Sequence, residues 1–330
     1  MILAGIDIGT NSLRLLVADV GPDSFREILS VRKVTRLGQD LDGTGKLSHD
    51  AEKRSLSVLL DFKEYIRHHA AVHIAALGTS ALRNASNSAE FIGEVNKRTG
   101  LDIGIITGEE EARLMLLGVA EALKGPGARQ GDPLASTLVI DIGGGSTEII
   151  ITRSGRAPLV ASLPLGAVYL TERFIKHDPP SASELEQLRD TVKNVLARHG
   201  DRMKPDSAGV LVGTAGTITT LAAMNQGLAE YEPDKINRCT MAGETIDGIV
   251  ENLAVSTLAE RRTIPGLEKG REDIILAGAV VTQEIMKQFG FSTMIVSDGG
   301  LREGIVLDLY ERHGKDKHQM THESPISKYK

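Results

Sequence analysis

The sequence predicts an α/β protein built from two duplicated domains, and three observations carry this prediction. The chain has 330 residues, more than one hydrophobic core normally covers. Strand-like and helix-like segments alternate along it. The motif Asp7-Ile-Gly-Thr-Asn-Ser12 recurs as Asp141-Ile-Gly-Gly-Gly-Ser146, at an offset of 141 − 7 = 134 residues, and each copy lies between two apolar strands. A repeat at the equivalent place in each half indicates duplication.

The first predicted domain covers residues 1–123 and opens with two apolar strands around a short turn. A Gly-rich loop is expected at 38–45. Apolar periodicity predicts strands at 2–8, 13–20, 26–34, 72–78 and 103–106, and helices at 48–69, 86–99 and 108–123. The Gly/Pro-rich segment KGPGARQGDP at 124–133 then marks the break between the domains.

The second predicted domain covers residues 124–299 and repeats the pattern. Its predicted strands are 137–142, 147–153, 157–163, 209–212 and 293–296, and its predicted helices are 166–176, 181–199, 215–225, 243–254 and 271–289. A last helix at 300–312 is a candidate to pack back on the first domain. Residues 313–330 are polar and aperiodic, which predicts a mobile tail.

Composition excludes several classes of function. No apolar run approaches 18 residues and the N-terminus has no basic signal-peptide start, so we expect no membrane partner and a cytoplasmic location. The lone Cys239 suits a reducing compartment, and the nine His form no zinc-binding spacing. A net charge of −6, no Trp and 3% aromatic residues argue against a nucleic-acid partner.

The two repeated motifs are predicted to be phosphate-binding hairpins. A four-residue turn would place Asp141 opposite Glu148, and Asp7 opposite Arg14, on one face of each hairpin. Glycine permits a positive φ that turns backbone N–H groups toward an anion, while the serine hydroxyls add donors. The alternative is a merely permissive turn. The predicted phosphate-binding residues are Gly9, Thr10, Asn11, Ser12, Gly143, Gly144, Gly145 and Ser146.

A third candidate phosphate loop follows the predicted strand that ends at Val212. Its small residues would let the N–H groups at a helix start reach a ligand oxygen. The residues are Gly213, Thr214, Ala215, Gly216 and Thr217. The alternative is ordinary helix capping by threonine.

The segment ITGEEEARL supplies a candidate catalytic carboxylate. Thr107 and Glu110 have the spacing of a capping box, and Glu109 lies in the favourable first turn. Glu111 is not used by that cap and could face the interdomain cleft. The alternative for three successive glutamates is a solvated helix start.

Three arginines are candidates for contacts with phosphate. Arg83, in a Ser/Thr/Asn-rich turn, suits a bidentate phosphate contact. Arg271 and Arg302 stand in KGREDIILAG and DGGLREG, where each could instead cap a helix or pair with adjacent acids. Arg14 and Arg271 are retained as possible substrate contacts.

Seven motifs in order together resemble the exopolyphosphatase/guanosine pentaphosphatase family, in the superfamily of actin, sugar kinases and the Hsp70 ATPase. They span residues 3 to 308 and read GIDIGTNSLRLLVADV, LGTSALRNASN, ITGEEEARL, DIGGGSTEI, LPLGAVYLTERF, VGTAGTITTLAA and SDGGLREGI. The resemblance implies two ribonuclease-H-like domains with an active-site cleft between them. The extra C-terminal helical domains of larger members are not matched, so the short two-domain form is expected.

The resemblance also implies the chemistry. It implies release of orthophosphate from inorganic polyphosphate, or of the 5′-γ-phosphate from guanosine pentaphosphate (pppGpp) in the stringent response. The implied metal is Mg²⁺, with Mn²⁺ as the alternative. Glu111 falls on the family's catalytic glutamate. Asp141 and Glu148 fall on its metal-binding carboxylates, which Asp7 would assist, and Arg83 falls on a phosphate contact. A homodimer is the family's expected assembly.

Alternatives and one departure remain open at this point. The chain could be a kinase of the same superfamily, a non-catalytic sensor of guanosine tetra- or pentaphosphate, or an actin-like filament. Retention of Glu111, Asp141 and Glu148 argues against the sensor. The family's common SDYGLREG reads SDGGLREG here, with Gly299 in the tyrosine position.

Overall fold

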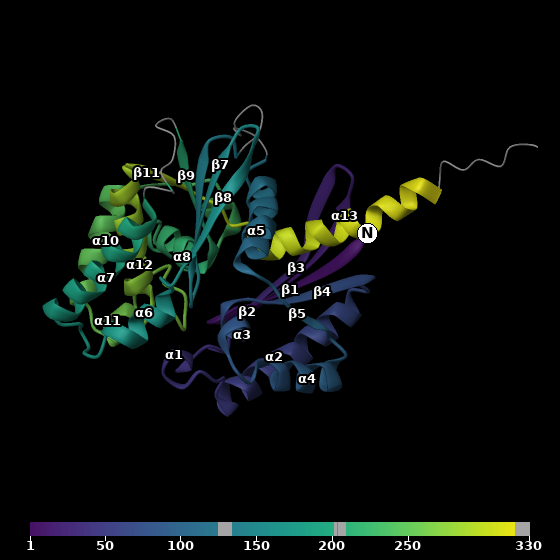
Figure 1. Ribbon diagram of the computed structural model, residues 1–330, viewed down its shortest axis with the longest axis horizontal. Coiled ribbons are helices and arrows are strands. Elements are labelled where there is room, and N and C mark those ends of the chain that lie inside the picture. Colours follow the sequence, from purple (N-terminus) through teal and green to yellow (C-terminus); the bar gives the residue numbers. More distant parts are fainter. Residues whose placement is uncertain (125–133, 201–202, 204–208, 321–330) are drawn as a thin grey trace, which may run out of the picture.

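The computed structural model describes residues 1–124, 134–200, 203 and 209–320. The predicted interdomain break at 124–133, apart from Lys124, and residues 321–330 of the predicted tail lie outside the described residues. Two β-sheets form the described structure, each in its own lobe with its own helices (Figure 1). No helix in the described part of the chain is long and apolar enough to cross a bilayer.

The first sheet has the strand order β3-β2-β1-β4-β5. Strand β1 pairs antiparallel with β2 and parallel with β4, and β4 pairs parallel with β5. The strands are β1 Ile2–Ile8, β2 Ser12–Gly21, β3 Ser24–Val34, β4 His73–Gly78 and β5 Ile103–Ile105. The helices of this part of the chain are α1 Leu41–Thr44, α2 His49–His68, α3 Ser80–Asn84, α4 Ser88–Thr99 and α5 Gly108–Ala122.

The second sheet repeats that order as β8-β7-β6-β9-β11, with β10 added at its edge. Strand β6 again pairs antiparallel with the next strand and parallel with β9. The strands are β6 Thr137–Ile142, β7 Thr147–Arg153, β8 Arg156–Leu163, β9 Val210–Thr214, β10 Thr240–Ala242 and β11 Thr293–Val296. The helices are α6 Ala167–Phe174, α7 Ala182–Gly200, α8 Ala215–Asn225, α9 Pro233–Ile236, α10 Gly243–Val255, α11 Leu258–Arg261, α12 Ile275–Phe289 and α13 Leu301–Met320. The predicted duplication is confirmed by this topology.

Side chains alternate between the two faces of each central strand, and this alternation sets what each face can do. In β6, Leu138, Ile140 and Ile142 enter the large core under α7, α8, α10 and α12. Val139 instead packs with Met115 and Val119 of α5. Asp141 shares the face of Val139, so its carboxylate points toward the side that α5 covers.

Helices α5 and α13 are exchanged between the two lobes. Helix α5 belongs to the first half of the sequence but packs on the second sheet, against Val139, Ile150 and Val212. Helix α13 comes last and packs on the first sheet, where Val306 and Leu309 meet β1 and β2. In Figure 1, α5 lies beside the strands of the second sheet, and α13 runs from α5 along the strands of the first sheet. The domain limits 1–123 and 124–299 therefore stay a prediction, because the packing does not follow the order of the sequence.

Glycines let α5 and α13 cross in backbone contact. A Cβ on Gly304 would lie 1.7 Å from the carbonyl oxygen of Leu114, and a Cβ on Gly118 would lie 1.9 Å from that of Gly300. Gly304→Ala should therefore lower the free energy of unfolding by about 1–3 kcal/mol, the usual cost of overpacking.

The matched control for this prediction is Gly93→Ala, in the middle of α4, where a Cβ would meet no atom within 4 Å. This exposed helical site should gain up to about 1 kcal/mol from the higher helix propensity of alanine. Urea unfolding of both variants measures the difference. Equal stability of Gly304→Ala and the wild type would disprove the close crossing.

The last helix differs from its prediction. Helix α13 continues to Met320, past the expected end at 312, so residues 313–320 are helical where an aperiodic tail was predicted. Four of the elements that the sequence pattern missed, α1, α3, α9 and α11, are helices of one turn or little more. Such helices are too short to develop an apolar period.

Candidate active site

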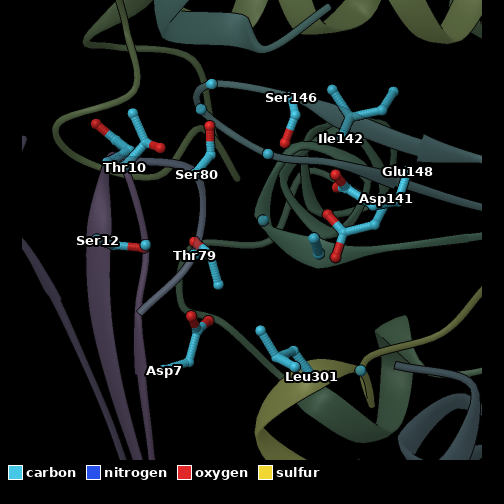
Figure 2. A pocket seen from close by; sticks show the side chains of 18 of the residues that line it. Asp7, Thr10, Ser12, Thr79, Ser80, Asp141, Ile142, Ser146, Glu148 and Leu301 are labelled. Atoms are coloured by element: carbon cyan, nitrogen blue, oxygen red, sulfur yellow. The ribbon is translucent and has the colours of Figure 1, made fainter. Parts of the chain in front are cut away.

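The two hairpins have the predicted register. Asp141 pairs with Glu148 across β6 and β7, and Asp7 pairs with Arg14 across β1 and β2. Glu148 shares the face of Ile150, which packs with α5. Both carboxylates of the second hairpin therefore point toward α5. Figure 2 shows the carboxyl groups of Asp141 and Glu148 side by side, with Asp7 on the other wall.

The glycines of the second hairpin act differently from the prediction. None of Gly143, Gly144 and Gly145 is among the glycines with positive φ. Their role is to admit the opposite lobe: a Cβ on Gly144 would lie 3.0 Å from Cβ of Thr10, and one on Gly145 would lie 2.6 Å from Oγ of Ser80. The two hairpin tips thus meet across the cleft because neither glycine carries a side chain.

An interdomain cavity of about 70 Å³ lies between the hairpins. Its lining residues include most of the predicted site: Asp7, Gly9, Thr10, Asn11, Ser12, Arg14, Glu111, Asp141, Gly143, Gly144, Gly145, Ser146, Glu148, Thr214, Gly216 and Arg271. Since one water needs about 10–15 Å³ of such volume, the enclosed part of the cavity has room for a few water-sized groups.

Three predicted phosphate contacts do not line the cavity. Arg83 lies behind Glu111, and its Nη1 donates to the Ile106 carbonyl at 2.7 Å. The Thr217 hydroxyl donates to the Ile142 carbonyl at 2.9 Å, which ties α8 to β6. Gly213 is the fourth residue of β9, where a Cβ would lie 2.5 Å from Sδ of Met294. A direct contact of these three residues with phosphate stays a prediction.

Glu111 lies in the first turn of α5 and is 7% exposed. The Thr107 hydroxyl accepts the N–H of Glu110, as the predicted cap requires. The Glu110 side chain does not return to Thr107 to complete a capping box; it binds Arg113 at 2.8 and 2.9 Å. Glu111 is therefore left to the cavity, where Nη1 of Arg83 donates to its Oε2 at 3.2 Å.

The cavity concentrates negative charge. Burial, then the charges of Glu148 and Asp141, raise the pKa of Glu111 to about 9, against a smaller opposing effect of Arg83. Burial and the charge of Glu148 raise the pKa of Asp141 to about 7. Burial also raises the pKa of Glu148 and brings that of Asp7 to about 6. Buried carboxylates repel one another unless a cation joins them.

The second hairpin offers two carboxylates as candidate ligands for a divalent metal ion. In the described part of the chain, no group of three or more His, Cys, Asp or Glu side chains could hold a metal ion, so Asp7 does not complete a three-carboxylate site. Mg²⁺ is commonly bound through one or two carboxylates, with waters and substrate phosphates as the other ligands. Asp141 and Glu148 are two such carboxylates, and a cation between them would offset the repulsion by which Glu148 raises the pKa of Asp141.

The arginines Arg14 and Arg271 enter the cavity from opposite lobes. They converge at Gly216, where a Cβ would lie 2.0 Å from Nη2 of Arg271 and 2.8 Å from Nη2 of Arg14. Arg271 also forms an ion pair with Glu268, as one of the two sequence interpretations expected. Arg302 pairs with Glu303 at 2.5 Å and with Asp298 at 3.5 Å.

Sequence reasoning missed three polar residues that line the cavity: Thr79, Ser80 and Asp298. The repeat contained a signal for the first two. Gly78-Thr79 stands at the end of β4 as Gly213-Thr214 stands at the end of β9, at an offset of 213 − 78 = 135 residues, so the third loop is duplicated as well. Asp298 stands in the motif SDGGLREGI, which also contains Gly299 and Arg302.

Gly299 lies against α5, which gives its local effect. A Cβ there would lie 2.5 Å from Cβ of Ala122 and 2.8 Å from the carbonyl oxygen of Gly118. The Gly299 carbonyl accepts the hydroxyls of Thr214 and Ser297, each at 2.8 Å. This backbone leaves no room for the tyrosine that the family motif has at this position.

Comparisons with known proteins give the family of the chain. The model of the Ppx/GppA phosphatase family matches residues 16–313. Exopolyphosphatase 2 of Mycobacterium tuberculosis is 33% identical over 322 residues, which cover 93% of this chain and 98% of the relative.

Two crystal structures extend this likeness to the fold. The Aquifex aeolicus member of the Ppx/GppA family has a TM-score of 0.77 at 32% identity, over 95% of this chain and 99% of that chain. An exopolyphosphatase from Cytophaga hutchinsonii has a TM-score of 0.84 at 27% identity, over 94% of this chain and 98% of that chain. The predicted pair of ribonuclease-H-like domains is confirmed. The chain belongs to the Ppx/GppA phosphatase family, whose members are phosphoanhydride hydrolases.

Proposed function

We propose that the chain is an exopolyphosphatase, which releases orthophosphate from the end of inorganic polyphosphate by attack of water. The observation that carries the proposal is one buried carboxylate, Glu111, facing the paired Asp141 and Glu148 in a cavity of about 70 Å³ between two hairpins. A cavity of this size takes a terminal phosphoryl group, a metal ion and a water, and leaves the rest of the substrate outside.

In this scheme, separate residues bind the phosphoryl group, activate the water and hold the metal. The backbone and hydroxyl groups of the two hairpins hold the terminal phosphoryl group in place. Glu111 orients the water and takes its proton as the water oxygen bonds to phosphorus. The bond from phosphorus to the bridging oxygen breaks, and that oxygen leaves with the shortened chain. Mg²⁺, or Mn²⁺, held by Asp141 and Glu148 would neutralise charge on the phosphoryl oxygens.

Arg83 is a positioning residue in this scheme, because it acts through Glu111. Its guanidinium favours the ionised form of Glu111, so Arg83→Gln should raise the pKa of that carboxylate further. The acid limb of the pH–rate profile should then move to higher pH, with the lost rate recovered as the pH rises. Arg83→Lys, which keeps the charge, is the control. An unshifted profile for Arg83→Gln would remove Arg83 from the mechanism.

The substrate is tested by orthophosphate release from long-chain polyphosphate, short-chain polyphosphate, pppGpp and ATP, with Mg²⁺ and with Mn²⁺. We expect polyphosphate to be turned over with the highest kcat/KM. Faster turnover of pppGpp would assign the alternative activity, and transfer of phosphate from ATP to an acceptor would indicate a kinase. We further propose that the protein acts in the cytoplasm and that it forms a homodimer. Sedimentation of the purified protein would test the homodimer.

A further inference from the structure

A second cavity, of about 330 Å³, opens beside the central one. Arg14, Ala215 and Asp298 line both cavities, so their walls are continuous. The other residues that line it are Glu27, Ser30, Arg32, Thr219, Tyr231, Pro233 and Arg302. We call this space the basic cavity.

The basic cavity carries positive charge in excess of its partners. Arg14 and Arg32 are paired across β2 and β3, so both guanidinium groups project from the same face of the sheet. Arg271, from the other lobe, lines the central cavity next to them, and the carboxylate of Glu268 pairs with both Arg32 and Arg271. Two arginines thus share one glutamate, and the charge of Arg14 also acts on Asp7 and Asp141. Burial together with repulsion from Arg271 and Arg14 lowers the pKa of Arg32 to about 9.

Two of the other charged groups of the basic cavity, Arg302 and Asp298, are already paired with each other, and burial raises the pKa of the third, Glu27. Arg302 binds Glu303 at 2.5 Å, Asp298 at 3.5 Å and the hydroxyl of Ser30. Tyr231 donates its hydroxyl to Asp298, and the guanidinium carbon of Arg32 lies 6.0 Å from the centroid of its ring. The excess charge therefore belongs to the group of Arg14, Arg32 and Arg271, next to the central cavity.

The opposite flank of the central cavity has the reverse charge. A third cavity, of about 410 Å³, shares Thr10, Ser80 and Gly145 with the central one. Its charged lining residues are Asp42 and Glu172, with no Lys or Arg among those that line it in the described part of the chain. We call this space the acidic cavity. A polyanion would be repelled there and attracted to the basic cavity.

We propose that the polyphosphate chain behind the terminal phosphoryl group lies in the basic cavity, with its second phosphate at Arg14 and its third at Arg32. This inference rests on the proposed function and adds the direction in which the substrate chain leaves the central cavity. After each cleavage the shortened chain remains bound through Arg32. The site should therefore favour chains of three or more phosphates over pyrophosphate, whose two phosphates do not reach Arg32.

Equilibrium binding tests whether the polyphosphate chain enters the basic cavity, and it does so without hydrolysis. Calorimetry on Glu111→Gln, with Mg²⁺ present, gives Kd for pyrophosphate, tripolyphosphate and a longer polyphosphate. Adding Arg32→Gln should weaken tripolyphosphate and the longer chain by about tenfold or more, the size expected for one charge-assisted contact, and leave pyrophosphate unchanged. Arg32→Lys, which keeps the charge, should retain part of the affinity.

The acidic cavity supplies the matched control. Asp42→Asn should leave all three Kd values unchanged, because Asp42 lines only the acidic cavity. Any of three results would overturn the proposal. Arg32→Gln could raise the Kd of all three ligands equally, or it could raise none of them. Alternatively, Asp42→Asn could bind the longer chains more tightly. Absence of orthophosphate release by the wild type would contradict the proposed function instead, because these Kd values do not depend on hydrolysis.

Discussion

Glu111→Gln should lower kcat for orthophosphate release by about 10²–10⁴-fold, the usual contribution of a general base. The substitution keeps the size of the side chain and its place in the first turn of α5. It removes the only group that we propose takes the proton from water. Substrate affinity should persist, because the hairpins and the arginines that hold phosphate are unchanged. Initial rates and calorimetric Kd values on the same preparation separate the two effects.

The neighbouring glutamate is the control for that substitution. Glu110 belongs to the same first turn but pairs with Arg113 on the exposed side of α5. Glu110→Gln should retain kcat near the wild-type value. Near-normal turnover by Glu111→Gln, or an equal loss of kcat in both variants, would contradict the assignment of Glu111 as the general base.

Glu148→Gln should raise thermal stability while it lowers activity by about 10²-fold or more. Activity falls because the variant keeps one carboxylate, Asp141, of the pair that we propose binds the metal. Stability rises because burial of the Glu148 carboxylate raises its pKa above the unfolded value, against smaller opposing effects of Ser162, Ser146 and Arg83. Above the unfolded pKa the unfolded chain then binds fewer protons than the folded chain, so Glu148 reduces stability as the pH rises.

Calorimetric unfolding at pH 5 and pH 8 without metal checks this prediction, and the gain in Tm should be larger at pH 8. Glu184 provides a control of opposite sign: hydrogen bonds from Ser181, His177 and Lys176 lower its pKa to about 2. Its stabilising effect is present above the unfolded pKa and is lost as the pH falls toward 2. Glu184→Gln should therefore lower Tm at neutral pH. Full activity with Mg²⁺ in Glu148→Gln would contradict the metal assignment.

The hairpin register could be predicted from the sequence because it depends on local rules. Strand alternation and a four-residue turn are enough to place Asp141 opposite Glu148. The duplication could be predicted for the same reason, since the similar local motifs DIGTNS and DIGGGS recur at residues 7–12 and 141–146. The role of Gly144 and Gly145 could not be predicted from local rules. A Cβ at either position would crowd Thr10 or Ser80, which belong to the opposite lobe.

The exchange of α5 and α13 between lobes also lies beyond local pattern. Both helices are apolar on the faces they bury, but the period of a sequence does not state which sheet a face will meet. The position of Arg83 illustrates the consequence for function. Its turn resembles a phosphate site, whereas the packing of α5 places Glu111 beside its guanidinium.

The central claim, that water attacks the terminal phosphoryl group in the interdomain cavity, is tested most directly by hydrolysis in ¹⁸O-labelled water. Wild-type protein with Mg²⁺ and long-chain polyphosphate should release orthophosphate that carries one solvent oxygen, and the shortened chain should carry none. Glu111→Gln should release no labelled orthophosphate above background on the same time scale. Label in the shortened chain, or orthophosphate without label, would contradict the account.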